Sequence, residues 1–227
     1  MRYLLLGALV LGALTVAPSA GATNECRGLN PCVPVAGPWV VVPAARTMPR
    51  PQAQYQLTCP RGFVVAGIDA ELSDQAIDLA FLGTSGTPVS PGVTTSQSIV
   101  FVASYVGDRP RAPTFRPHIG CIPATGGGTR TPTAVRAVTP PGHPTARRVV
   151  TSRVRGESTV RTACRADERL VGWYVTRGFG TATPPAAALV ASLHVKTTVS
   201  RNAVAALARA GRGQGIVQVG ALCAGGK

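Results

Sequence analysis

Several motifs that commonly mark an enzyme are missing from this chain of 227 residues. It has no Gly-x-Ser-x-Gly elbow, no His-Glu-x-x-His pair and no Walker-type glycine loop, so nothing indicates a serine hydrolase, a zinc protease or a nucleotide-binding enzyme. No two cysteines have C-x-x-C spacing, which disfavours a zinc or redox site. No Asn-x-Ser/Thr glycosylation acceptor is present either. The absences favour a non-catalytic role without naming a ligand.

Aromatic and acidic residues are also scarce. Aromatics make up 5% of the chain, and 9 acidic residues face 23 basic ones, for a net charge of +14. Residues 23–129 hold seven basic and six acidic groups, whereas residues 130–227 hold fifteen and three. The net charge of about +12 on the second half predicts that this half meets any anionic partner.

Only one long hydrophobic run occurs, from Leu4 to Val16. It follows Arg2 and ends in small residues up to Ala22, a pattern typical of a secretory signal. As a helix it would be about 20 Å long, too short for a bilayer core of about 30 Å. We therefore expect residues 1–22 to be a cleaved signal peptide and the mature chain to be extracellular, with no transmembrane segment. Export also disfavours an intracellular nucleic-acid partner.

The six cysteines fit an internal duplication. Cys59 and Cys164 each precede a polar turn, a hydrophobic pair and a glycine eight residues on, Gly67 and Gly172. A second cysteine follows each at nearly the same separation. An even cysteine count in an exported chain indicates disulfides. Equivalent pairing within two equivalent copies selects Cys26–Cys32, Cys59–Cys121 and Cys164–Cys223.

Short valine-rich runs between 26 glycines and 20 prolines predict an all-β chain. We expect strands over 39–42, 54–59, 62–70, 77–83, 97–105, 114–122, 147–155, 158–164, 169–176, 187–196 and 215–223. The alanine-rich segment 202–210 suits either helix or strand, and its counterpart in the first copy favours strand. The predicted organisation is two tandem, disulfide-closed β-sandwich modules of about 90–105 residues each. The first spans 23–129, a Gly/Pro-rich linker spans 130–146, and the basic second module spans 147–227.

Arginines concentrated in the second module are candidate ligands for an anionic polymer, because guanidinium groups bind phosphate and carboxylate through paired hydrogen bonds. The candidates are Arg148, Arg153, Arg155, Arg161 and Arg177. Trp173, Tyr174 and Phe179 lie nearby in sequence and could stack on sugars or bases. The alternative is that Trp173 is a core residue and the arginines only keep the module soluble.

An acidic cluster in the first module is the other candidate site. It consists of Asp69, Glu71, Asp74 and Asp78, and it has no counterpart in the second module. Four carboxylates could bind Ca²⁺ or supply a general acid and base. The alternative is a solvated strand edge that discourages aggregation. No other cofactor is expected, and the histidines His118, His143 and His194 are assigned structural roles.

Three functional hypotheses follow. The first is a secreted non-catalytic module that binds an anionic cell-envelope or extracellular polymer through the basic second half. The second is a secreted hydrolase or calcium-dependent protein that uses residues 69–78. The third is a structural or protein-interaction protein whose second copy packs on the first.

Overall fold

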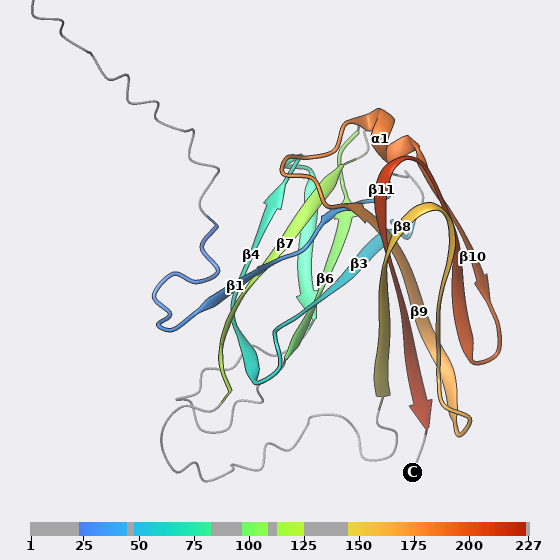
Figure 1. Ribbon diagram of the computed structural model, residues 1–227, viewed down its shortest axis with the longest axis horizontal. Coiled ribbons are helices and arrows are strands. Elements are labelled where there is room, and N and C mark those ends of the chain that lie inside the picture. The colour runs from blue at the N-terminus through green and yellow to red at the C-terminus, as the bar shows by residue number, and fades with distance from the viewer. Residues whose placement is uncertain (1–22, 45–47, 83–96, 109–112, 125–144, 226–227) are drawn as a thin grey trace, which may run out of the picture.

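The computed structural model describes residues 23–44, 48–82, 97–108, 113–124 and 145–225. The predicted signal peptide and most of the predicted linker lie outside these residues. The described chain is nearly all β, with one short helix (Figure 1). The strands are β1 (Val33–Ala36), β2 (Trp39–Val41), β3 (Gln52–Thr58), β4 (Phe63–Leu72), β5 (Ile77–Leu82), β6 (Ser98–Tyr105), β7 (Thr114–Pro123), β8 (Thr145–Ala163), β9 (Glu168–Phe179), β10 (Leu193–Val199) and β11 (Ala203–Gly225), and the helix is α1 (Ala187–Ala191).

Most predicted strands are present, and the differences lie in three places. The segments 147–155 and 158–164 form one strand, β8, and the segments 202–210 and 215–223 form one strand, β11. The predicted strand 187–196 is wrong over its first part, because Ala187–Ala191 is helical and β10 begins at Leu193. Alanine has the highest helix propensity of any residue, which explains the exception. β1 was not predicted, because Pro34 within it argues against a strand.

The front half packs two β layers around one core. The strands β3, β6 and β5 form a three-stranded sheet in the order β3-β6-β5, and β7 pairs with β4 in the facing layer. Alternate residues of these strands face inward, among them Ile99, Phe101, Phe115 and Ile119, each at most 1% exposed. They belong to one core cluster that also contains both cysteines of the Cys59–Cys121 disulfide.

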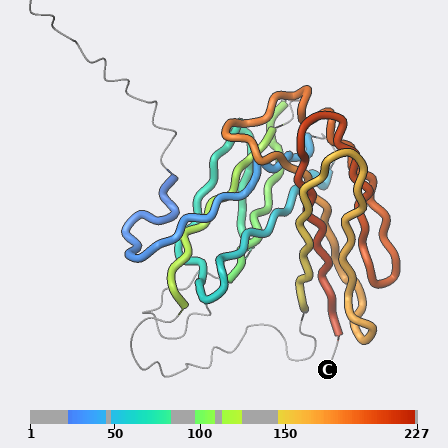
Figure 2. The backbone as a smooth tube through the Cα atoms, in the orientation of Figure 1, coloured from blue at the N-terminus to red at the C-terminus, as the bar shows by residue number. Residues whose placement is uncertain are grey.

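The second half is built on a two-stranded ribbon, β8 paired with β11, that folds over on itself. Ala146 pairs with Cys223 at one end of β8, yet Cys164, just beyond its other end, is disulfide-bonded to Cys223. On a straight strand Ala146 and Cys164 would lie about 60 Å apart. The ribbon bends where the register of β8 and β11 shifts, beside Gly156 at φ 71°. Figures 1 and 2 show both strands arching over at this point.

Folding the ribbon creates two facing layers. The first part of β8 and the last part of β11 form one layer with β9, whereas their other parts form a second layer with β10. Small buried side chains fill the space between them, including Val154, Val160, Ala206 and Val217. A core of alanine and valine lets the layers approach closely and explains how this half folds with few aromatics.

The two halves share one sheet. β2 pairs with β7 of the front half through Val40 and Phe115, and with β9 of the second half through Trp39 and Phe179. A small core at the junction joins Val41 to Phe179 and to residues of α1 and β10. The halves therefore have separate main cores and a continuous sheet between them.

The three disulfides join Cys26 to Cys32, Cys59 to Cys121 and Cys164 to Cys223, the pairings that the spacing selects. Each long bridge joins two cysteines of the same half: Cys59–Cys121 in the front half and Cys164–Cys223 in the second. No helix in the described part of the chain is long and apolar enough to cross a membrane.

Candidate functional site

The layer formed by β10, the first part of β11 and the second part of β8 exposes a face that carries positive charge. The register of β8, β11 and β10 places Glu157, Arg209 and His194 in one row, Thr159, Leu207 and Lys196 in the next, and Arg161, Ala205 and Thr198 in a third. Side chains alternate along a strand. Since Val160, Ala206 and Ala208 point into the core, these nine point outward.

We call Arg161, His194, Lys196 and Arg209 the basic face; all four are exposed. Arg209 forms an ion pair with Glu157, both more than half exposed. Among the described residues, Arg161 and Lys196 have no carboxylate within ion-pair distance. The outward side chains between them are uncharged, namely Thr159, Thr198, Ala205 and Leu207. The positive charge of Arg161 and Lys196 is therefore exposed and accessible to an extended anion.

A cleft of about 520 Å³ lies beside this face, between β9, β10 and the chain that follows β2. Trp173, Val175 and Arg177 line it from one face of β9, and Val195 and Thr197 line it from β10. The remaining lining residues are Thr176 of β9 and residues 41–44 and 52–53 of the front half. None of the described residues that line the cleft is acidic. Among the described strands, β10 pairs with β11 on one side only, and its residues Val195 and Thr197 line the cleft.

Trp173 is 48% exposed although it lies on the strand face that points between the layers. Arg177, four residues on, is half-buried and donates a hydrogen bond to the carbonyl oxygen of Leu193. Burial lowers the pKa of the Arg177 guanidinium, because desolvation disfavours its charged form. Arg177 also lines a second hollow of about 400 Å³ with His194, Lys196 and Arg209. The cleft and the basic face therefore meet at this side chain.

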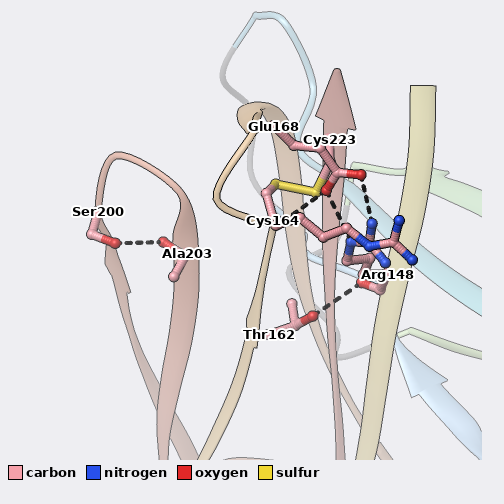
Figure 3. Close-up of a disulfide and its surroundings, with 8 residues drawn as sticks. Arg148, Thr162, Cys164, Glu168, Ser200, Ala203 and Cys223 are labelled. Carbon is pink, nitrogen blue, oxygen red and sulfur yellow. Dashed lines mark hydrogen bonds and ion pairs between the residues drawn. A yellow bond between two sulfur atoms is a disulfide. The ribbon is translucent and has the colours of Figure 1, made fainter. Parts of the chain in front are cut away.

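The five predicted arginines do not form one site. Arg161 lies on the basic face and Arg177 in the cleft. Arg148 points toward the core side, where it makes two hydrogen bonds to Glu168 at 2.6 and 3.2 Å beside the Cys164–Cys223 bridge (Figure 3).

Arg148 therefore has a structural role in this conformation. Arg153 and Arg155 are exposed on the other face of β8, and Arg153 lines a hollow against Tyr55 and Leu57 of the front half. If the second copy packed on the first through charge, Arg153 or Arg155 would pair with Asp74 or Asp78, and no such ion pair occurs among the described residues.

Of the three aromatic candidates, only Trp173 is accessible. Phe179 is 1% exposed and belongs to the junction core. Tyr174 is 5% exposed; its hydroxyl donates to Gln218 at 3.0 Å, and the guanidinium of Arg147 lies over its ring. Burial raises the pKa of Tyr174 to about 12, although nearby Arg147 partly opposes the shift.

The four acidic candidates are used separately. Asp69 accepts hydrogen bonds from the backbone N–H groups of Asn24 and Ala70, and Asp74 accepts from Ala76 N–H and the Tyr105 hydroxyl. Asp78 is exposed on the edge strand β5.

Glu71 lies 2.8 Å from Nε2 of His118 and 3.7 Å from Arg116. In the described residues, the one group of potential ligands close enough to share a metal is Cys164, Glu168 and Cys223, and its two cysteines are disulfide-bonded. The structure thus does not bring Asp69, Glu71, Asp74 and Asp78 together.

Sequence reasoning missed Lys196, His194 and Arg209 as site residues. The alternation of His194, Lys196 and Thr198 was available as a signal, since it marks one polar face of a strand. Only the cross-strand register shows that this face continues across β11 to Arg161.

No protein-family model, curated protein or solved structure matches this chain.

Proposed function

We propose that this protein is a secreted, non-catalytic binding protein that recognises an anionic cell-envelope or extracellular polymer through the basic face of its second half. The basic face supports this proposal, because Arg161 and Lys196 are exposed and have no acidic partner among the described residues. Side chains that lie in rows across three neighbouring strands suit a chain-like ligand that contacts several of them at once. The three disulfides are compatible with an oxidising compartment.

We further propose that the chain is a tandem duplication of one two-layer, disulfide-closed β-sandwich module after a cleaved leader. The pairing order β3-β6-β5 in the front half corresponds to the order in which the second part of β8, the first part of β11 and β10 pair. β4 with β7 corresponds likewise to β9 with the last part of β11.

A shared irregularity supports this correspondence. Val65 pairs with Cys121 and Gly67 with Gly120, so the register skips one residue of β4. Leu170 pairs with Cys223 and Gly172 with Leu222, so the register skips one residue of β9. Both bulges begin six residues after the first cysteine of their half. β-Bulges at matching positions are typical of related strands.

Binding to a polymer over a salt series tests the proposed function. The wild-type protein should sediment with insoluble cell-wall polymer and bind soluble polygalacturonate at low salt. Affinity should fall steeply as salt rises, because cationic side chains release counterions from a polyanion when they bind. The double variant Arg161→Ala/Lys196→Ala should bind at least about tenfold more weakly, with a shallower salt dependence.

The matched control is Arg27→Ala/Arg61→Ala, which removes the same charge from exposed positions of the front half. It should bind nearly as well as the wild type. Equal losses in both double variants would show attraction by net charge alone and would overturn the assignment to the basic face. No binding of either polymer at low salt would overturn the proposed function.

A further inference from the structure

We propose that the cleft lined by Trp173 and Arg177 binds a short acidic oligosaccharide, that is, sugar rings carrying an anionic group. This inference rests on the proposed function and names the ligand class that one part of the binding surface selects. The basic face attracts polyanions in general, whereas the cleft combines a flat aromatic ring with a desolvated cation.

The size of the cleft fits such a ligand. Small-molecule sites enclose roughly 300–1,000 Å³, and this cleft encloses about 520 Å³. Trp173 and Arg177 lie on the same strand face with Val175 between them. Their Cα atoms are therefore about 13 Å apart along β9, a span longer than a single sugar ring. A ligand that lies along this whole span is therefore an oligomer.

Trp173 offers the stacking surface. A tryptophan that faces the space between two layers is normally covered, yet this one is 48% exposed because the cleft leaves its side open. Its indole presents a flat apolar face with one N–H donor, which suits the apolar face of a sugar ring whose hydroxyls remain in water. Valines 41, 42, 175 and 195 continue this apolar lining.

Arg177 selects for the anionic group. A half-buried guanidinium pays a desolvation cost that is normally offset by an acidic partner. Among the described residues, its one hydrogen-bond partner is the carbonyl oxygen of Leu193. None of the described residues that line the cleft or the second hollow is acidic. The guanidinium therefore keeps donors for a carboxylate or phosphate, which it can hold in a paired geometry. Gln52 and Thr197 supply further polar groups at the rim.

Continuity with the basic face extends the site. Because Arg177 lines both the cleft and the hollow formed by His194, Lys196 and Arg209, a bound oligosaccharide can continue out of the cleft onto that face. This arrangement holds one segment specifically and the rest of the chain by charge.

Tryptophan fluorescence reports directly on the cleft. The chain has two tryptophans, and Trp39 is only 2% exposed, so a ligand that covers Trp173 changes the emission of that residue alone. Titration with trigalacturonate should shift and saturate the emission. The neutral counterpart, galactotriose, should bind at least tenfold more weakly, and tripolyphosphate, which has the charge without rings, should leave the emission unchanged.

Variants separate the two contributions. Arg177→Gln should reduce trigalacturonate affinity at least tenfold in calorimetry, whereas the matched variant Arg153→Gln, exposed outside the cleft, should bind like the wild type. Trp173→Ala should abolish oligosaccharide binding and retain most of the salt-dependent polymer binding. Circular dichroism and thermal unfolding confirm that each variant is folded.

The outcomes distinguish this inference from the proposed function. Polymer binding that depends on Arg161 and Lys196, without trigalacturonate binding, would overturn the cleft assignment and leave the proposed function standing. Tripolyphosphate binding as tight as trigalacturonate binding would make the cleft a simple anion site and would overturn the sugar specificity. Trigalacturonate affinity unchanged by Arg177→Gln would also overturn it.

Discussion

The substitution Gln218→Leu should destabilise the protein strongly, because one buried amide joins the two halves. Gln218 is 2% exposed. Its Oε1 accepts hydrogen bonds from the Gln56 backbone N–H at 2.7 Å and the Tyr174 hydroxyl at 3.0 Å. Its Nε2 donates to the Gln56 carbonyl oxygen at 3.1 Å and to Thr151 Oγ1 at 2.9 Å.

The Gln218 side chain thus makes the two backbone hydrogen bonds that a neighbouring strand would make with Gln56. In its sheet, β3 pairs with β6 on one side, and Gln56 presents its backbone N–H and C=O on the other. The amide of Gln218 satisfies both groups, and Thr176 donates to the next outward carbonyl, that of Gln54. An otherwise open strand edge is covered by the face of the second half.

The magnitude follows from the four hydrogen bonds. Each contributes about 1 kcal/mol net, and leucine leaves the buried partners unsatisfied. We therefore expect a loss of about 3–5 kcal/mol in the free energy of unfolding. Since small proteins are stable by only about 5–15 kcal/mol, the midpoint of urea denaturation should fall markedly.

The matched control is Gln56→Leu, in which the backbone groups of the junction are retained. Within the described residues, the Gln56 side chain makes one long hydrogen bond, 3.4 Å to Thr58, so this variant should lose less than about 1 kcal/mol. Urea denaturation followed by circular dichroism measures both. If the two variants lose the same stability, Gln218 does not join the halves and the reasoning is refuted.

Three further predictions concern local contacts. A Cβ at Gly67 would lie 1.7 Å from a backbone oxygen of the N-terminal loop, whereas one at Gly172 would lie 3.5 Å from its nearest neighbour, so thermal melting should show a large loss for Gly67→Ala and little change for Gly172→Ala. The pKa of Tyr55 and of Tyr174 is raised to about 12, mainly by burial. Burial of the neutral hydroxyls contributes stability that is fully present below pH 10 and should be lost as the pH rises toward 12. Phenolate absorbance at 295 nm should appear at a higher pH than for exposed tyrosines. Hydrogen bonds, chiefly from an arginine side chain, lower the pKa of Glu168, so its stabilising contribution should vanish on acidification through that lowered pKa, and Glu168→Gln should flatten the acid limb of stability against pH.

Much of the β structure could be predicted from local pattern. Alternation in residues 98–105 predicts a strand over 97–105, within one residue of β6. The prediction of two strands, 147–155 and 158–164, was wrong because β8 continues through Gly156, where the ribbon bends. A turn and a bend have the same glycine signal, and only the partner strand distinguishes them.

The candidate site was predicted less well. Arg148 and Arg161 look alike in sequence, yet one is paired with Glu168 and the other is free of carboxylates among the described residues. Tyr174 and Trp173 are neighbours, and alternation shows that they face opposite ways without showing which way is open.

The sequence by itself determined the cysteine pairing, the positions of most strands and the concentration of positive charge in the second half. These depend on spacing and composition, which are properties of the chain alone. The tertiary structure decided which arginines share a face, which are neutralised and where a cleft remains open. Those properties depend on cross-strand register and on how the folded ribbon meets β2 and β3, and contacts between distant residues leave no local pattern in the sequence.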